Sequence, residues 1–119
     1  MGSAARAAAE RYVEAVNKAD ITALMALFAP GAVLRHPTGT YDSSDKIQGF
    51  YENIVFRGKA ALTTTKLLDT PEFSMLEMYA VSPFRPDHKQ WAVDVFEVGG
   101  GGLVTQLSIY YIELGMPGK

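Results

Sequence analysis

The chain has 119 residues, of which 48% are hydrophobic and 20% charged, a balance typical of one globular domain rather than of a disordered or fibrous protein. It contains no cysteine, which excludes disulfides, a thiolate nucleophile and cysteine-based metal sites. The 11 Lys and Arg against 13 Asp and Glu give a formal net charge of −2, without the basic surplus of a nucleic-acid binder.

Segments that would direct the chain to a membrane are not visible in the sequence. No apolar run approaches the ~20 residues of a membrane span, and the start does not resemble a signal peptide. We therefore predict one cytoplasmic domain over residues 1–119, with no membrane or nucleic-acid partner. Residues 1–3 resemble the remnant of an expression tag and are left out of the fold prediction. With only two histidines we predict no metal site.

The first part of the chain predicts two helices. Segment 4–17 is rich in alanine, and its apolar side chains, Tyr12 included, recur at spacings of three and four. Asp20 is a typical N-cap for a second helix. The apolar stripe of that helix includes Phe28, and Pro30 followed by glycine should end it.

A short strand and a third helix follow. Segment 32–36 alternates as a strand does, and Pro37 should end it. Ser43 or Ser44 then caps a third helix. The apolar side chains of this helix fall at i, i+3, i+4 and i+7, namely Ile47, Phe50, Tyr51 and Ile54.

After residue 58 the apolar period changes from 3.6 to 2, which predicts strands. The expected strands are 59–68, 74–81, 91–98 and 103–114, with a glycine turn at 99–102 and a polar, solvated loop around His88. Helices first and mostly antiparallel strands after them predict an α+β fold, in which helices pack on a strongly curved sheet. Such a cone offers an apolar pocket.

Three polar side chains fall where the pattern predicts a core. Tyr12 lies on the inward face of the first helix, where it either packs as an ordinary aromatic or offers its hydroxyl to a ligand. Glu97 shares a strand face with Val93 and Val95. If that face is the core, Glu97 is a buried carboxyl that stays protonated; otherwise it meets solvent at the strand end. His36 alternates inward with Leu34 and is either a hydrogen-bonded structural residue or a base.

Together these segments resemble the ketosteroid isomerases, of the nuclear-transport-factor-2-like, or cystatin-like, cone fold. The resemblance covers roughly residues 8 to 114. It rests on the segments RYVEAV at 11–16, ADI at 19–21, LFA at 27–29, AVLRHPTG at 32–39, IQGFY at 47–51 and WAVDVFEV at 91–98. The scaffold also carries polyketide cyclases, epoxide hydrolases and non-catalytic binders, so fold alone does not fix the activity.

The resemblance implies a cofactor-free allylic proton transfer on a 3-oxo steroid or similar polycyclic ketone. In that family an Asp moves the proton, while a Tyr and a protonated Asp hydrogen-bond the oxygen of the dienolate. Tyr12 matches the tyrosine of this oxyanion hole, and Tyr51 matches a second tyrosine behind it. Glu97 stands where the protonated acid is expected. Phe28 replaces a third member of the network and lacks its hydroxyl.

The expected general base is missing, because His36 precedes Pro37 where the family has Asp-Pro. Either His36 is the base, since its ordinary pKa suits proton abstraction at neutral pH, or the base is lost and the protein only binds its ligand. Asp42 and Asp45 do not fall at the matching position, so we interpret them as cap and solvent residues.

These inferences define the predicted site and assembly. The catalytic residues are Tyr12, His36 and Glu97, and the ligand-binding residues are Phe28, Phe50, Tyr51, Val95 and Tyr111. The predicted ligand is a small apolar polycyclic molecule. The resemblance implies a homodimer through the outer face of the sheet, where we expect the apolar side chains Phe96 and Tyr110.

Overall fold

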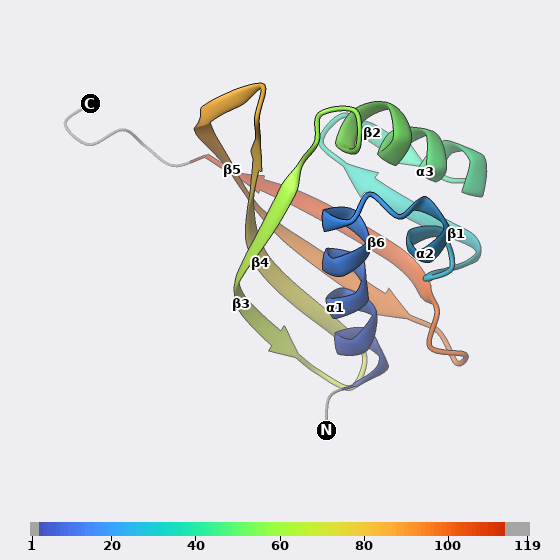
Figure 1. Cartoon of the computed structure of the whole chain (residues 1–119). Helices are drawn as coiled ribbons and strands as arrows, with labels where there is room; N and C mark the ends of the chain where they lie inside the picture. The colour runs from blue at the N-terminus through green and yellow to red at the C-terminus, as the bar shows by residue number, and fades with distance from the viewer. Residues whose placement is uncertain (1–2, 114–119) are drawn as a thin grey trace.

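In the computed structural model, which describes residues 3–113, helices cover one face of a six-stranded curved sheet (Figure 1). The helical elements are α1 (Ala4–Asn17), α2 (Ile21–Met25), α3 (Ser44–Phe50) and a π-helical turn, η1 (Tyr51–Val55). The strands are β1 (Phe28–His36), β2 (Gly39–Tyr41), β3 (Ala61–Asp69), β4 (Phe73–Ser82), β5 (Arg85–Val98) and β6 (Val104–Ile112). The predicted α+β cone is therefore confirmed.

The sheet has the strand order β2-β1-β6-β5-β4-β3. Every neighbouring pair is antiparallel except β1 and β6, which run parallel, so the sheet is mixed as predicted. Helix α1 lies across the concave face, where it packs against β3, β4 and β5 (Figure 1). Helix α3 packs against β1 and β2. The core fills the space between these helices and the sheet.

The predicted caps are present. The Asp20 side chain accepts a hydrogen bond from the Ala23 N–H, and Ser43, rather than Ser44, accepts one from the Lys46 N–H. Ser3, which the sequence prediction left out, caps α1 and also donates its hydroxyl to Asp69 at the end of β3. The start of the first helix is therefore tied to the sheet.

The predicted second helix is too long. Helix α2 ends at Met25, and Phe28 begins strand β1 instead of continuing the helical stripe. The reason is a long-range pairing: the Val104 N–H donates to the Leu27 carbonyl at 2.8 Å, and Phe28 pairs with Val104 in the sheet. Tertiary pairing overrides the local helical pattern here.

The prediction of a loop around His88 is also wrong. Strand β5 begins at Arg85, directly after a tight turn from β4, and Ser82 pairs with Arg85. Residues 85–89 are exposed, so their polar composition reflects contact with solvent and does not indicate a loop. At the other end of the sheet, the last strand was expected to reach 114, which lies outside the described residues.

The apolar run of the third helix continues into a wider turn. The Phe56 N–H donates to the Tyr51 carbonyl at 2.8 Å, five residues back, which is π-helical spacing. Ile47, Phe50 and Tyr51 are buried as predicted, while Ile54, in the wider turn, is half exposed because it borders an open cavity.

Strand β5 faces the core with the opposite side from the one predicted. Ala92, Asp94 and Phe96 are buried, and Val93, Val95 and Glu97 lie on the other, partly exposed face. Phe96 is fully buried against Tyr12, with ring centroids 5.1 Å apart, so it is not available to an outer dimer face. Tyr110 is exposed, as predicted. The homodimer itself stays a prediction.

The assignment of the β5 faces can be tested by stability. Phe96→Ala should lower the free energy of unfolding by about 3–5 kcal/mol, because it removes a fully buried ring. Val95→Ala removes methyl groups from the half-buried face and should cost about 1 kcal/mol. Urea denaturation of both variants measures the difference. A larger loss for Val95→Ala would mean that the valine face is the core.

Candidate active site

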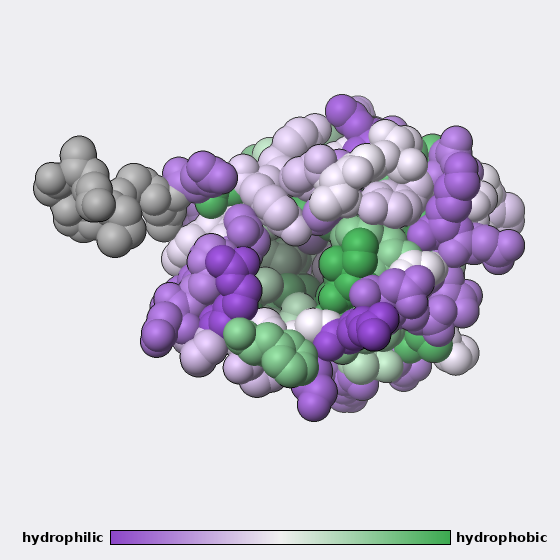
Figure 2. All heavy atoms as spheres, turned by 90° about the horizontal axis from the view of Figure 1, so that it is seen from above, coloured by the Kyte–Doolittle hydropathy of each residue, from purple (hydrophilic) through white to green (hydrophobic). Residues whose placement is uncertain are grey.

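The concave side of the sheet holds a cavity of about 510 Å³, within the usual size of a small-molecule site. Viewed from above, a hollow with hydrophobic walls opens between largely hydrophilic rims (Figure 2). Its walls come from α1, α3, η1, the end of β1 and strands β3 to β6. Many of its lining side chains are apolar, among them Val16, Phe50, Val55, Leu62, Met78 and Ile109.

Two buried tyrosines form one wall. The Tyr12 and Tyr51 hydroxyls share a hydrogen bond of 2.8 Å, but only Tyr12 lines the cavity. Burial, and then the nearby Tyr51 and Asp94, raise the pKa of Tyr12 well above its ordinary value. Tyr12 is therefore a neutral hydrogen-bond donor at physiological pH. Tyr51 is fully buried behind Tyr12 and orients the Tyr12 hydroxyl. Tyr51 was predicted to contact the ligand, but it can act on a ligand only through Tyr12.

Asp94 lies on the same wall and was not predicted as a site residue. In the sheet it pairs with Leu76 on β4 and Ile109 on β6, both buried, and its carboxyl is almost completely removed from solvent. Its Oδ1 has no hydrogen-bond partner among the described residues. Burial raises the pKa of Asp94 from 3.8 to about 8, so at pH 7 it is mostly a neutral acid that can donate a hydrogen bond.

Glu97 and Val95 do not reach this cavity. Both lie on the other face of β5, where Glu97 accepts a hydrogen bond of 2.8 Å from the Gln106 side chain. The prediction that Glu97 is the buried acid is therefore wrong in its placement. The alternation along β5 correctly places Asp94 and Glu97 on opposite faces. Both faces are apolar, however, with Val93 and Val95 on one and Ala92 and Phe96 on the other. The sequence pattern alone could not choose the buried face.

Of the other predicted ligand-binding side chains, some line the cavity and one does not. Phe50 and Tyr111 line the cavity, as predicted. Phe28 is buried in the core at the start of β1 but does not line the cavity.

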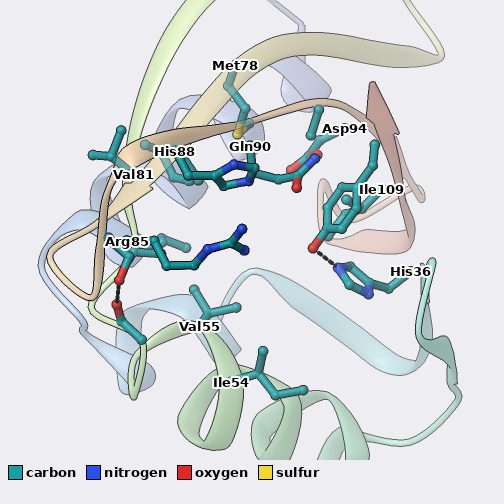
Figure 3. A pocket seen from close by; sticks show the side chains of 18 of the residues that line it. His36, Ile54, Val55, Met78, Val81, Arg85, His88, Gln90, Asp94 and Ile109 are labelled. Carbon is teal, nitrogen blue, oxygen red and sulfur yellow. Dashed lines mark hydrogen bonds between the residues drawn. The ribbon is translucent and has the colours of Figure 1, made fainter. Parts of the chain in front are cut away.

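His36 lies at the end of β1 on the side of the cavity formed by Phe50 and Tyr111. Its Nε2 is 2.7 Å from the Tyr111 hydroxyl (Figure 3), and its ring stands perpendicular to the Tyr111 ring. The Thr38 backbone N–H donates to Nδ1 at 3.1 Å, and the Thr38 hydroxyl is 2.9 Å from the same atom. Partial burial lowers the pKa of His36 from 6.5, so the imidazole is neutral at pH 7.

The bond from the Thr38 N–H fixes the tautomer in this arrangement. Because Nδ1 accepts a hydrogen, the neutral ring carries its own proton on Nε2 and donates it to Tyr111. To act as a base toward the cavity, the ring must instead hold its proton on Nδ1, where the Thr38 hydroxyl can accept it. Tyr111 must also turn away from Nε2.

The mouth of the cavity is polar. Arg85, His88 and Gln90, all from β5, line the cavity on one side, and Arg85 and His88 are exposed (Figure 3). Sequence reasoning missed them because it placed the first two in a solvated loop. A signal was present, since His88, Gln90, Ala92 and Asp94 alternate onto one face. Within residues 3–113, no three His, Asp or Glu side chains gather closely enough to hold a metal ion.

This arrangement can stabilise negative charge on a ligand oxygen. Two neutral donors, Tyr12 and protonated Asp94, are buried in a largely apolar wall, where hydrogen bonds to a developing oxyanion are stronger than in water. A neutral imidazole lies elsewhere on the same lining.

A sequence profile for the SnoaL-like domain matches residues 9–106, which is most of the chain. The chain belongs to the SnoaL-like domain family. No curated protein gives a significant match to the sequence. No helix within residues 3–113 is long and apolar enough to cross a membrane.

Solved structures resemble this SnoaL-like domain closely in fold. A Kribbella flavida protein assigned as a ketosteroid isomerase shares 21% identity, covering 98% of this chain and 83% of its own, with a TM-score of 0.83. A Methylobium petroleophilum protein of cystatin-like fold shares 18%, covering 98% and 80%, with a TM-score of 0.81. A Mycobacterium tuberculosis protein solved with estradiol-17β-hemisuccinate shares 17%, covering 92% and 95%, with a TM-score of 0.80. At these identities the likeness establishes the fold.

The buried acid predicts an unusual pH dependence of stability. Since the pKa of Asp94 is about 8 in the folded state and 3.8 ordinarily, the folded protein binds a proton that the unfolded chain releases between these values. The free energy of unfolding should therefore be highest near pH 4 and fall by about 1.4 kcal/mol per pH unit up to pH 8 from this group. Asp94→Asn should abolish this slope.

At pH 8 the Asp94→Asn variant should be more stable than the wild type by several kcal/mol, on the order of 5 at most, and similar to it near pH 4. Urea denaturation across this pH range measures the effect. Asp87→Asn, at an exposed position on the same strand, is the matched control and should leave the slope unchanged. Parallel curves for the wild type and Asp94→Asn would show that Asp94 is ionised when folded.

Proposed function

We propose that this protein is a ketosteroid-isomerase-like enzyme that moves an allylic proton in a flat polycyclic ketone. The observation that carries the proposal is the unpaired, protonated Asp94 carboxyl beside the Tyr12 hydroxyl in an apolar cavity. Buried polar groups without partners are rare, and a carbonyl oxygen supplies the acceptor that the Asp94 acid lacks. Asp94 takes the role that the sequence prediction gave to Glu97.

The reaction needs a proton acceptor, and His36 is the neutral base on the cavity wall. In the proposed reaction, Nε2 takes the proton from the α carbon while Tyr12 and Asp94 donate hydrogen bonds to the ketone oxygen. The resulting dienolate keeps the electron pair. The imidazolium then returns the proton to the γ carbon, which yields the conjugated ketone with no net gain or loss of atoms. No cofactor takes part.

The ligand class follows from the shape and chemistry of the cavity. Its volume of about 510 Å³ and apolar lining suit a rigid fused-ring molecule. That the Mycobacterium tuberculosis relative in fold was solved with a steroid ester supports the same class. A hydrolase is less well supported. A water-activating Asp must be ionised, whereas Asp94 is protonated, and the lining shows no Asn partner among the described residues.

The isomerase proposal predicts conversion of an unconjugated 3-oxo steroid, seen as new ultraviolet absorbance of the conjugated enone. His36→Ala should abolish turnover, and His36→Asp should retain or raise it, because the aspartate is a base without the Tyr111 and Thr38 constraints. Tyr12→Phe and Asp94→Asn should each reduce kcat by about 10²–10³-fold, since each weakens the oxyanion hole. Tyr110→Phe, on the outer face, is the control for a lost phenol and should leave kcat unchanged.

Unchanged turnover in His36→Ala would remove His36 from the mechanism. Unchanged turnover in both Tyr12→Phe and Asp94→Asn would remove the proposed oxyanion hole.

A second candidate is a ligand-binding protein without turnover. The tautomer of His36 favours it, because the Thr38 N–H occupies Nδ1 and the Nε2 proton is donated to Tyr111. In this case Tyr12 and Asp94 hold the ligand oxygen, and His36 is only a structural donor.

Binding of a phenolic steroid such as estradiol tests what the two candidates share, and turnover separates one from the other. Isothermal titration should detect binding in both cases, with about tenfold or greater loss in Tyr12→Phe. The binder predicts that the wild type, with estradiol bound normally, converts no unconjugated steroid at any pH. If estradiol fails to bind the wild-type protein, both candidates are wrong.

A further inference from the structure

The mouth of the cavity carries positive charge that the proposed chemistry does not use. Arg85 and His88 both line the cavity, at the opposite end of strand β5 from Phe96. In the close view the Arg85 side chain extends inward across the opening, and the His88 and Gln90 side chains follow it along the strand toward Asp94 (Figure 3).

The Arg85 guanidinium has no ionic partner within the described part of the chain. The ion pairs there are Arg6–Glu10, Lys18–Glu14 and Lys46–Asp42, all in or next to helices, and none of these residues lines the cavity. The neighbouring cation Lys89 points to the other face of the strand, where its Nζ lies 4.5 Å from the centroid of the Tyr79 ring. Arg85 is thus a cation that lines the cavity and that no described residue neutralises.

The geometry of β5 places this cation far from the oxyanion hole. His88 and Asp94 lie on the same face of one strand and are six residues apart, which corresponds to roughly 20 Å between backbone positions at ~3.3 Å per residue. Both side chains of the mouth reach back toward the interior (Figure 3). A rigid ligand with its carbonyl oxygen at Asp94 therefore presents its opposite end to Arg85.

We propose that the natural ligand carries a carboxylate at the end opposite its ketone, and that Arg85 binds this carboxylate with His88 as a second donor. This proposal rests on the function proposed above and narrows its substrate class to keto acids with a polycyclic body. The two parallel N–H donors of one guanidinium match the two oxygens of a carboxylate. A phosphate monoester, with up to two charges, would call for more cations than this mouth provides.

The test compares two ligands that differ at the far end only. Estradiol and estradiol-17β-hemisuccinate share the phenol that mimics the dienolate, but only the second has a carboxylate at the opposite end. Isothermal titration of the wild-type protein should give about tenfold tighter binding of the hemisuccinate at low salt. This preference should shrink as ionic strength rises, because the mouth is open to solvent.

Arg85→Gln should remove the preference and leave the affinity for estradiol unchanged. Arg85→Lys should retain part of it, because the charge remains while the paired donors are lost. Arg11→Gln, an exposed arginine of α1 that does not line the cavity, is the matched control and should bind both ligands as the wild type does. Thermal melts establish that each variant is folded.

The outcomes separate this proposal from the function on which it depends. Equal affinity of the wild type for both ligands, or an undiminished preference in Arg85→Gln, would overturn the carboxylate site. If Asp94→Asn still weakens estradiol binding in that case, the oxyanion hole stands without it. If neither ligand binds the wild type, the proposed function fails, and the carboxylate site fails with it.

Discussion

The desolvation of one carboxyl group governs the chemistry of this protein. Asp94 lies between buried neighbours on the two flanking strands, β4 and β6. Among the described residues no cation pairs with its carboxyl, and no group hydrogen-bonds to Oδ1. An ionised carboxylate there would lose its hydration without compensation, so the group keeps its proton at neutral pH. A neutral acid is a hydrogen-bond donor, and a buried donor in an apolar wall can stabilise an anion that forms opposite it.

The rest of the fold places groups around that acid. Helix α1 brings Tyr12 to the same wall, and the π-helical turn after α3 starts at Tyr51, whose hydroxyl meets that of Tyr12. The Phe96 ring packs against the Tyr12 ring and so fixes how far the phenol lies from the sheet. Burial of Asp94 costs the protein stability at neutral pH, a trade that is common where function requires a group in an unfavourable environment.

Strand β5 connects the two ends of the site. It is the longest strand described, and its inward face runs from a charged and polar mouth to the acid and then to the aromatic core. In the function proposed above, one continuous element therefore sets both the position of the ligand oxygen and the chemistry met by the opposite end of the ligand. His36 enters from β1 on a separate side, which is why its hydrogen bonds to Thr38 and Tyr111, and not the oxyanion hole, decide whether it acts as a base.

Local patterns in the sequence were sufficient for the fold class, the first helix, the Asp20 cap and the inward positions of Tyr12, His36, Phe50 and Tyr111, because helical and strand periodicities report burial directly. They could not select the buried face of β5. Both of its faces are apolar, and the choice between Asp94 and Glu97 depends on which face α1 covers. Nor could they reveal that residues 85–89 extend a strand beside the cavity, since exposed strands and loops share a polar composition. Tertiary packing alone decided these two points, and with them the identity of the buried acid and the charge at the mouth.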